Sequence, residues 1–219
     1  FNDLTIIQDF LPERNVYLLD EAAVTKEDIE LGNKVAEKKI ESLLKKKLRV
    51  GFIGRFLLEK GLNDFIQVVE KSKRIGLDLE FSIAGKYDDN NNSSLNMNQI
   101  SSKYPEVKLF EEPKYQDYFK EIDILLFCSY REGHPLFLLK SMCYGVVPVV
   151  YPVPGVGNDV ISEYNGLIAN QIHPSALVSK LLELNDDRNK IKSFSKNCLK
   201  YVKTNFQSNV TLSFKEFMD

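Results

Sequence analysis

From residue 48 onward, short apolar runs alternate with amphipathic stretches, and this alternation limits the possible folds more than any other feature of the chain. A strand buried in a parallel sheet is a short, nearly continuous apolar run, whereas a covering helix is apolar at spacings of three and four. The pattern predicts an α/β fold with a parallel sheet of about six strands and helices on both faces. The expected strands are Arg49–Gly54, Leu79–Ala84, Val107–Phe110, Ile124–Cys128, Val147–Tyr151 and Gly166–Ala169.

Helical patterns lie between and beyond these strands. One helix is expected to begin near Lys60, a second to end at Ile122, and a third to cover Leu136–Tyr144. The first carries one apolar face formed by Leu62, Phe65, Ile66 and Val69. Three more apolar stripes predict a helical C-terminal end: Leu177, Leu181 and Leu184, then Ile191, Phe194, Cys198 and Val202, then Val210, Phe214 and Phe217.

Residues 1–47 allow two interpretations, a linker or the first strand–helix unit of the domain that occupies residues 48–219. The segment has a short predicted strand, Val16–Leu19, and a helix whose inward face would be Ile29, Ala36, Ile40 and Leu43. The polar run at residues 88–94 cannot contribute to a core and is expected to be an exposed loop. Because the chain begins with Phe1, we expect it to be part of a longer protein.

Composition narrows the function classes. A hydrophobic content of 43% can fill a sizeable core, and a net charge of −2 provides no general attraction for nucleic acid or anionic lipid. No apolar run reaches the roughly 20 residues that span a bilayer. The odd, widely spaced cysteines Cys128, Cys143 and Cys198 suit reduced thiols in a core, so a cytoplasmic location is expected.

Unusual residues gather where the predicted strands end. Four motifs lie at the carboxyl ends of expected strands: Gly54-Arg55, Gly85-Lys86, Ser129–Pro135 and Tyr151–Gly157. Ligands of open parallel sheets bind beyond the carboxyl ends of the strands, where helix N-termini present their amide groups. The sequence therefore predicts a ligand site at this edge of the sheet.

The loop at residues 129–135 is the most informative of these. Pro135 suits the first turn of the following helix, and Gly133 would let the backbone approach a ligand closely. An anion such as a diphosphate would be held at that helix N-terminus, with Arg55 and Lys60 as matching cations. Ordinary turn chemistry before a helix, together with solvated surface charges, is the alternative interpretation.

Taken in order, these motifs resemble a known family, the C-terminal domain of retaining GT-B glycosyltransferases of family 4, or glycosyl transferases group 1. This group includes sugar transferases for bacterial capsules and lipopolysaccharide. The resemblance covers roughly residues 48 to 205. It is carried by Gly54-Arg55-Phe56, Lys60-Gly61, Glu132-Gly133-His134-Pro135, Leu138-Leu139, Met142–Gly145, Val147–Val150 and Asn165–Ile168.

The resemblance implies a Rossmann-like domain that binds a nucleoside-diphosphate sugar. Arg55 and Lys60 would contact the diphosphate, and Glu132 would be the catalytic residue on the transferred sugar. The amides near His134, Pro135 and Leu136 would contact the phosphates and sugar, and the base would lie near Gly85 and Phe110. Gly54 and Gly133 are also expected to bind the donor.

The family also implies catalysis without a metal or other cofactor. The chain has no Asp-x-Asp pair and only two histidines, neither of which favours a metal site. The expected partners are the donor, a glycan or lipid-linked acceptor in bacterial surface polysaccharide synthesis, and an N-terminal GT-B domain that this chain lacks. Attachment to the inner membrane would be peripheral, through that domain.

One position departs from the family pattern. The family has a second glutamate eight positions after the first, which usually holds the ribose hydroxyls, and this chain has Lys140 there. An ammonium group donates hydrogen bonds but cannot accept them as a carboxylate does. Either the donor is held differently, with Lys140 on a phosphate, or the domain is a non-catalytic module that acts in binding or scaffolding.

Two other nucleotide-binding classes are disfavoured. The first strand is not followed by the G-x-G-x-x-G of dinucleotide-binding dehydrogenases, and G-x-x-x-x-G-K-(S/T) of phosphate-loop NTPases is absent from the sequence.

Overall fold

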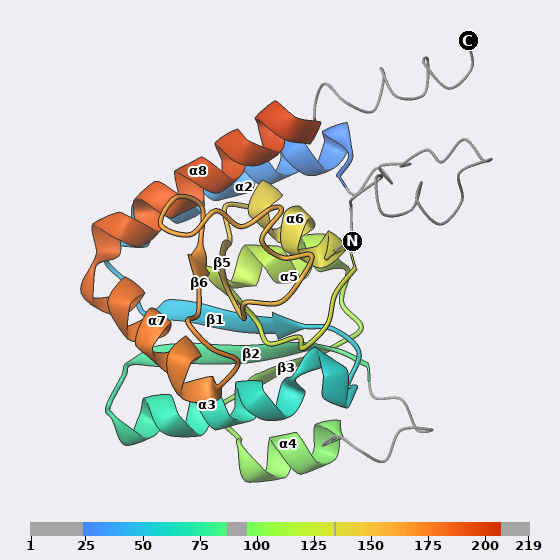
Figure 1. Cartoon of the computed structure of the whole chain (residues 1–219), viewed down its shortest axis with the longest axis vertical. Coiled ribbons are helices and arrows are strands. Elements are labelled where there is room, and N and C mark those ends of the chain that lie inside the picture. The colour runs from blue at the N-terminus through green and yellow to red at the C-terminus, as the bar shows by residue number, and fades with distance from the viewer. Residues whose placement is uncertain (1–23, 87–95, 134, 207–219) are drawn as a thin grey trace, which may run out of the picture.

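A computed structural model describes residues 24–86, 96–133 and 135–206 of the chain (Figure 1). Six parallel strands form one sheet in the order β3-β2-β1-β4-β5-β6. The strands are β1 Leu48–Ile53, β2 Leu79–Gly85, β3 Lys108–Glu111, β4 Ile124–Phe127, β5 Val147–Val150 and β6 Leu167–Ile168. The predicted fold class is confirmed, and each expected strand overlaps an observed one.

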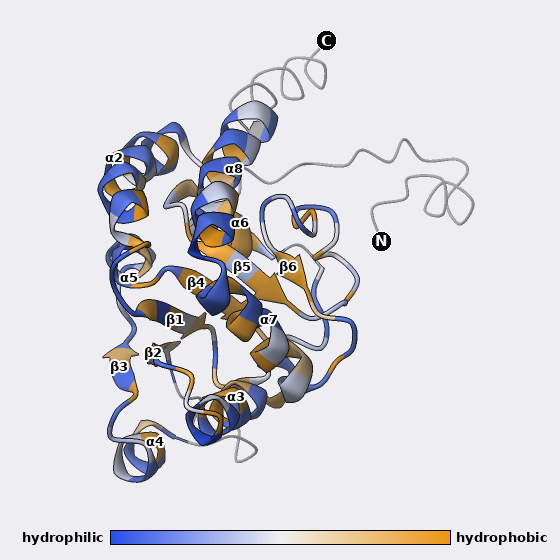
Figure 2. Ribbon diagram, turned by 90° about the vertical axis from the view of Figure 1, so that its left-hand side faces the viewer, coloured by the Kyte–Doolittle hydropathy of each residue, from blue (hydrophilic) through white to orange (hydrophobic). Residues whose placement is uncertain are grey.

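The helices cover both faces of the sheet. They are α2 Lys26–Ser42, α3 Leu62–Arg74, α4 Met97–Lys103, α5 Tyr115–Glu121, α6 Leu136–Cys143, α7 Pro174–Asp186 and α8 Arg188–Phe206, and a short 3₁₀ helix, η1 Leu58–Lys60, precedes α3. Figures 1 and 2 show α3 and α4 on one side of the sheet and α2, α5, α6 and α8 on the other. Helix α7 packs against α3 and β5.

The predicted helices that fall on described residues are confirmed. Helix α2 buries Ile29, Ala36 and Ile40, and Leu43 follows it into the core, so this helix packs in the same core as the sheet. Its N-terminus is capped by Thr25. The division of the chain at residue 47 stays a prediction. The expected strand Val16–Leu19, the loop at residues 88–94 and the last C-terminal stripe lie outside the described residues.

Helix α4 was not predicted from the sequence. It is short, and Ile100 is its one buried residue, so it lacks the repeated apolar positions that reveal an amphipathic helix. Its local signal is a capping box, in which the Asn96 and Gln99 side chains each accept from the other's backbone N–H.

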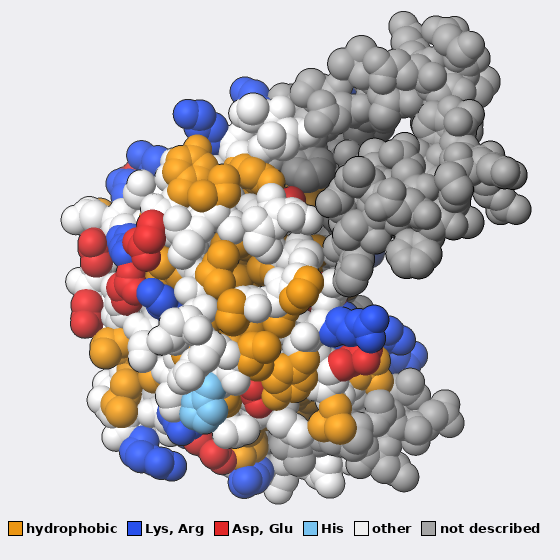
Figure 3. All heavy atoms as spheres, in the orientation of Figure 1, with side chains coloured by type: hydrophobic (Ala, Val, Ile, Leu, Met, Phe, Trp, Pro, Cys, Tyr) orange, Lys and Arg blue, Asp and Glu red, His pale blue; other side chains and the backbone are white. Residues whose placement is uncertain are grey.

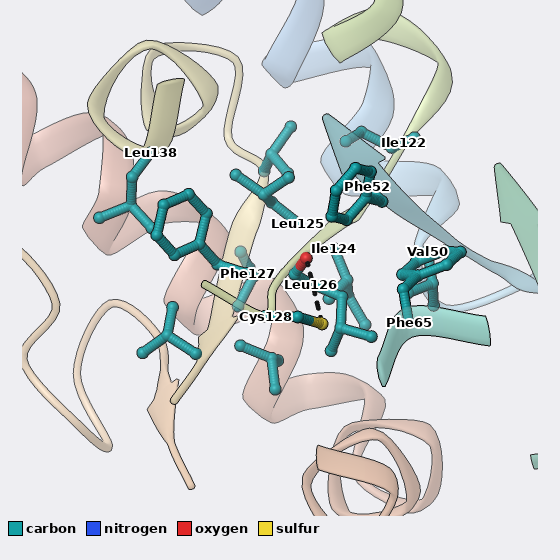
Figure 4. Packing of buried hydrophobic residues seen from close by; sticks show 14 of the residues in the cluster. Val50, Phe52, Phe65, Ile122, Ile124, Leu125, Leu126, Phe127, Cys128 and Leu138 are labelled. Atoms are coloured by element: carbon teal, nitrogen blue, oxygen red, sulfur yellow. Dashed lines mark hydrogen bonds between the residues drawn. The ribbon is translucent and has the colours of Figure 1, made fainter. Parts of the chain in front are cut away.

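The core is densest around the middle of the sheet. Every residue of β4 and β5 is buried, and Figure 2 shows these strands as strongly hydrophobic. In Figure 4 the β4 side chains lie between Phe52 and Phe65 on one side and Leu138 on the other. The centres of the Phe52 and Phe65 rings are 5.6 Å apart. The three cysteines are buried and free, as expected for reduced core thiols.

The strand order reverses between β1 and β4. From β1 the chain moves outward to β2 and β3, then crosses back to β4 and moves outward on the other side. The Asp123 carboxylate accepts from the Arg49 backbone and guanidinium, which joins β1 and β4 at their amino ends. Loops leaving the carboxyl ends of β1 and β4 diverge, and such a reversal is where open α/β sheets have a crevice.

Candidate nucleotide-sugar site

A cavity of about 210 Å³ lies at the carboxyl ends of β1 and β4. The loop after β1, the end of η1, the loop after β4 and the first turn of α6 form its wall. Its lining residues are Ile53, Gly54, Arg55, Lys60, Phe127, Ser129, Glu132, Pro135, Leu136 and Phe137. The cations and the acidic loop that sequence analysis singled out therefore meet in one cavity.

A larger cavity of about 610 Å³ adjoins the first. Both are lined by Ile53, Gly54, Arg55 and Phe137. The larger one extends toward the loop after β3 and the start of α5, where it is lined by Gly85, Lys86, Glu112, Pro113, Lys114, Tyr115 and Gln116. In Figure 3, basic and acidic side chains lie beside each other at the right-hand edge, the side toward which the β1 arrow of Figure 1 points.

Lys60 and Glu132 form an ion pair inside the smaller cavity. The Lys60 Nζ lies 2.8 Å from the Glu132 Oε1, and the side chains are 25% and 10% exposed, respectively. Gly61, with a φ of 72°, places Lys60 here, because a Cβ on it would lie 2.1 Å from the Cys128 carbonyl oxygen. This close approach of the chain to the end of β4 brings the two charged groups together across 72 residues of sequence.

Arg55 follows β1 and is exposed between the two cavities. The backbone beside it is tightly packed: Gly85 has a φ of 152°, and a Cβ there would lie 2.0 Å from the Gly54 carbonyl oxygen. Only glycine permits this contact, which keeps the ends of β1 and β2 together.

The N-terminus of α6 opens into the smaller cavity. Pro135 is the N-cap residue, one position before the first-turn site expected from the sequence. The amides of Leu138 and Leu139 donate to the Pro135 carbonyl, whereas no bond from the Leu136 or Phe137 amide is found among the described residues. These two N–H groups are donors of the kind that bind anions at helix N-termini. A Cβ on Gly133 would contact nothing within 4 Å.

Tyr115 forms an aromatic wall of the larger cavity. Its hydroxyl donates to the Asp28 Oδ1 at 2.8 Å, and burial together with this bond raises the pKa of Tyr115 to about 12. The Lys140 Nζ lies 4.5 Å from the centre of the ring, a cation–π contact. Lys140 is therefore one layer behind the cavity and is not among its lining residues.

Of the remaining site residues expected from sequence, Gly85 lines the larger cavity and Phe110 does not. Phe110 packs against Tyr118 with ring centres 5.3 Å apart and lines a separate small hollow that includes Arg49. His134 lies outside the described residues.

Sequence analysis missed Ile53, Phe127, Phe137 and the segment Glu112–Gln116 as lining residues, whereas Ser129 and Lys86 belonged to the motifs that it singled out. The segment follows β3, so the rule that sites lie beyond strand ends could have identified it. The structure also marks Glu112 as unusual, because a φ of 43° is rare for a residue with a side chain. Lys86 forms an ion pair with it at 3.3 Å.

Metal clusters and membrane-spanning helices are absent from the described parts of the chain. Residues 24–86, 96–133 and 135–206 contain no group of three or more His, Cys, Asp or Glu side chains that could hold a metal ion. Within the same ranges, no helix combines the length and the apolar character needed to cross a membrane.

Solved structures share this fold. HepE of Anabaena, in a structure with UDP and glucose, matches 87% of this chain with a TM-score of 0.71 and 15% identity, over 53% of its own chain. The C-terminal domain of LpcC, a glycosyl transferase group 1 family protein of Francisella tularensis, matches 79% of this chain and 91% of its own, with a TM-score of 0.64 and 16% identity. The fold is thus that of a GT-B C-terminal domain.

Curated relatives agree in sequence. An uncharacterized glycosyltransferase of Methanocaldococcus jannaschii, MJ1069, is 24% identical over 97% of this chain and 54% of its own length. CapM of Staphylococcus aureus, a capsular polysaccharide biosynthesis glycosyltransferase, is 21% identical over 84% of this chain and 49% of its own. The chain spans about half the length of these relatives. The family model for glycosyl transferases group 1 matches residues 33–201, most of the chain, and the protein belongs to that family.

Proposed function

We propose that this domain binds a nucleoside-diphosphate sugar and presents it for transfer to a hydroxyl group of an acceptor. The observation that carries the proposal is the cavity at the β1 and β4 ends, where Arg55, Lys60, Glu132 and the N-terminus of α6 converge. HepE has been solved with UDP and glucose, and TarM of Staphylococcus aureus with UDP, which supports a donor of this class.

The diphosphate would lie in the smaller cavity. Arg55 can hold two phosphate oxygens with its planar fork of donors, and Lys60 provides a point charge opposite it. The Leu136 and Phe137 amides add donors at the positive end of the α6 dipole. Because Glu132 already pairs with Lys60, these groups would offset part of the diphosphate charge, and we propose that the transfer needs no bound metal.

The nucleoside would occupy the larger cavity. Tyr115, Phe137 and Pro113 offer apolar surface for a base or ribose, and Lys86, Lys114 and Glu112 offer polar contacts at its margin. The family glutamate has no counterpart here, since position 140 is a lysine whose Nζ contacts the Tyr115 ring and which is not among the lining residues.

Glu132 would contact the transferred sugar. Its carboxylate accepts hydrogen bonds, which sugar hydroxyls donate, and Lys60 holds its Oε1, which leaves the second oxygen to accept from the sugar. We assign Glu132 the catalytic position in a transfer that retains the anomeric configuration.

The acceptor side of the reaction is proposed from the relatives of this chain. CapM is named for capsular polysaccharide biosynthesis, so we propose a glycan or lipid-linked acceptor in surface polysaccharide synthesis at the cytoplasmic side of the membrane. The acceptor would bind mainly to an N-terminal GT-B domain, because this chain spans about half the length of MJ1069 and CapM.

Titration calorimetry with UDP, GDP and their glucose and mannose derivatives tests the donor site. We expect binding by the wild-type chain and a loss of about tenfold or more in Arg55→Gln, because a charge-assisted bond to phosphate is removed. Arg74→Gln is the matched control, since Arg74 is exposed at the end of α3 and lines neither cavity. A folded wild-type chain that binds none of these ligands at millimolar concentration refutes the proposal.

Lys140 favours a second candidate, a binding module that has lost transfer activity. Under this hypothesis Lys140→Glu gains no nucleotide affinity, whereas an intact pocket that lacks only the carboxylate gains some. The same calorimetric titration separates the two.

A further inference from the structure

A buried carboxylate that lines neither cavity is hydrogen-bonded to the residue that follows β5. Asp64, in the first turn of α3, is 6% exposed, and its Oδ2 accepts a 2.6 Å hydrogen bond from the Tyr151 hydroxyl. Tyr151 follows β5 and is fully buried, and burial is the main cause that raises its pKa. Burying a carboxylate is costly unless it is well bonded, so this pair calls for an explanation beyond simple packing.

The pair connects to the loop that carries Glu132. The Tyr151 ring stacks on the Tyr130 ring, with centres 6.2 Å apart and planes 9° from parallel. Burial and the Asp64 carboxylate raise the pKa of Tyr130 to about 12. The Tyr130 amide also donates to the Glu59 carbonyl at 2.9 Å, so the loop is joined to the residue just before Lys60.

The loop after β5 packs against the loop that carries Glu132. Gly155 has a φ of 86°, and a Cβ there would lie 2.5 Å from the Gly133 carbonyl oxygen and 2.9 Å from that of Glu132. The Glu132 backbone is therefore confined between the Tyr151–Gly155 segment and the η1–α3 segment.

We propose that Asp64, Tyr151 and Tyr130 are positioning residues that hold the Glu132 loop in register with Lys60. None of the three lines either cavity, and all act through the loop backbone. The hydrogen bond to Asp64 fixes Tyr151, the stacked rings fix Tyr130, and Tyr130 fixes the chain two residues before Glu132. The ligand-binding part of this proposal rests on the proposed donor site, whereas the ordering of the loop does not.

Amide hydrogen exchange tests the ordering of the loop in the absence of any ligand. Tyr151→Phe removes one hydroxyl, and we expect amides in residues 129–136 to exchange about tenfold faster, as for local opening after loss of a charge-assisted bond. The matched control is Tyr104→Phe, because the Tyr104 hydroxyl donates to the Glu70 carboxylate on the same helix α3 at the same 2.6 Å, away from the cavities. Unchanged exchange in residues 129–136, or the same change in the control, overturns the proposal.

If Tyr151→Phe does not fold, Asp64→Asn combined with Tyr151→Phe removes the buried charge along with the hydroxyl and is measured in the same way. Exchange in residues 129–136 that matches wild type in this folded double variant also overturns the proposal.

Ligand affinity is a second measurement, and a purely structural role of Tyr151 in the core would not change it. We expect Tyr151→Phe to weaken binding of UDP-glucose or GDP-mannose about fivefold, at the low end of couplings between separate sites, and Tyr104→Phe to leave it unchanged. Because Tyr151→Phe is expected to act by displacing the Glu132 carboxylate, the effects of Tyr151→Phe and Glu132→Gln on ligand affinity should be non-additive. Additive effects overturn the positioning role. If the wild-type chain binds neither ligand, the donor site is refuted and the exchange measurement alone decides the loop proposal.

Discussion

Lys60→Met isolates the ion pair on which the candidate site depends. Methionine is an unbranched side chain that is one atom shorter than lysine and has no charge, so Glu132 loses the Nζ that lies 2.8 Å from its carboxylate. Exposed ion pairs contribute about 0–1 kcal/mol, whereas removing one partner of a buried pair costs about 3–5 kcal/mol. With side chains 25% and 10% exposed, this pair falls between the two limits, and we expect a loss of about 2 kcal/mol.

Thermal unfolding followed by circular dichroism measures this loss. For a domain of this size about 1 kcal/mol corresponds to a shift of about 2–4 °C in Tm, so Lys60→Met should lower Tm by about 4–8 °C. Glu132→Gln should cost less, because Lys60 is the more exposed partner and keeps more of its hydration. Combining both changes leaves no unpaired buried charge and should recover at least half of the loss.

The double variant gives the sharpest result. If Lys60→Met alone leaves Tm unchanged, or if the double variant is no more stable than Lys60→Met, Glu132 does not depend on Lys60 in the folded state, and the reasoning from burial is wrong.

Two further predictions concern the framework around the site. In urea denaturation, Gly61→Ala should destabilise the protein far more than Gly76→Ala. Both residues have a φ of 72°, which costs alanine about 1–2 kcal/mol, but only at Gly61 would the added methyl carbon meet a carbonyl oxygen, at 2.1 Å. Equal losses of stability in the two variants would contradict the close approach of Gly61 to the end of β4. Burial lowers the pKa of Lys39 to about 7, so just above pH 7 the unfolded chain binds a proton that the folded chain has released. The free energy of unfolding should therefore rise with pH from 7 to 8, below the range in which the buried cysteines, whose pKa values are raised, oppose the rise. Lys39→Met should abolish the rise, and equal slopes in the two proteins would contradict it.

Apolar runs made the sheet predictable. The strands β4 and β5 are buried at every residue, and such runs bounded by Gly and charged residues have few other interpretations. The convergence of Arg55, Lys60 and Glu132 was also predictable, because all three follow carboxyl ends of strands or lie at the start of the next helix.

Side-chain direction was harder to predict. Phe110 lies in β3 itself, and its ring turns to Tyr118 on α5 instead of toward the cavity at the strand end. Lys140 lies on α6, whose first turn lines the site, but its ammonium lies against the Tyr115 ring, which comes from a different helix. Neither orientation follows from the spacing of residues within one element, because each depends on how a second element packs against the first.

The pairing of β1 with β4 has a consequence for the order in which the protein folds. Of the charged residues that line the smaller cavity, Arg55 and Lys60 follow β1 and Glu132 follows β4, more than 70 residues later in the chain. Closing so long an intervening loop is slow relative to local contacts, so the pocket should be among the last features to take shape. A compound that fills it would then favour the finished fold over every partly assembled precursor.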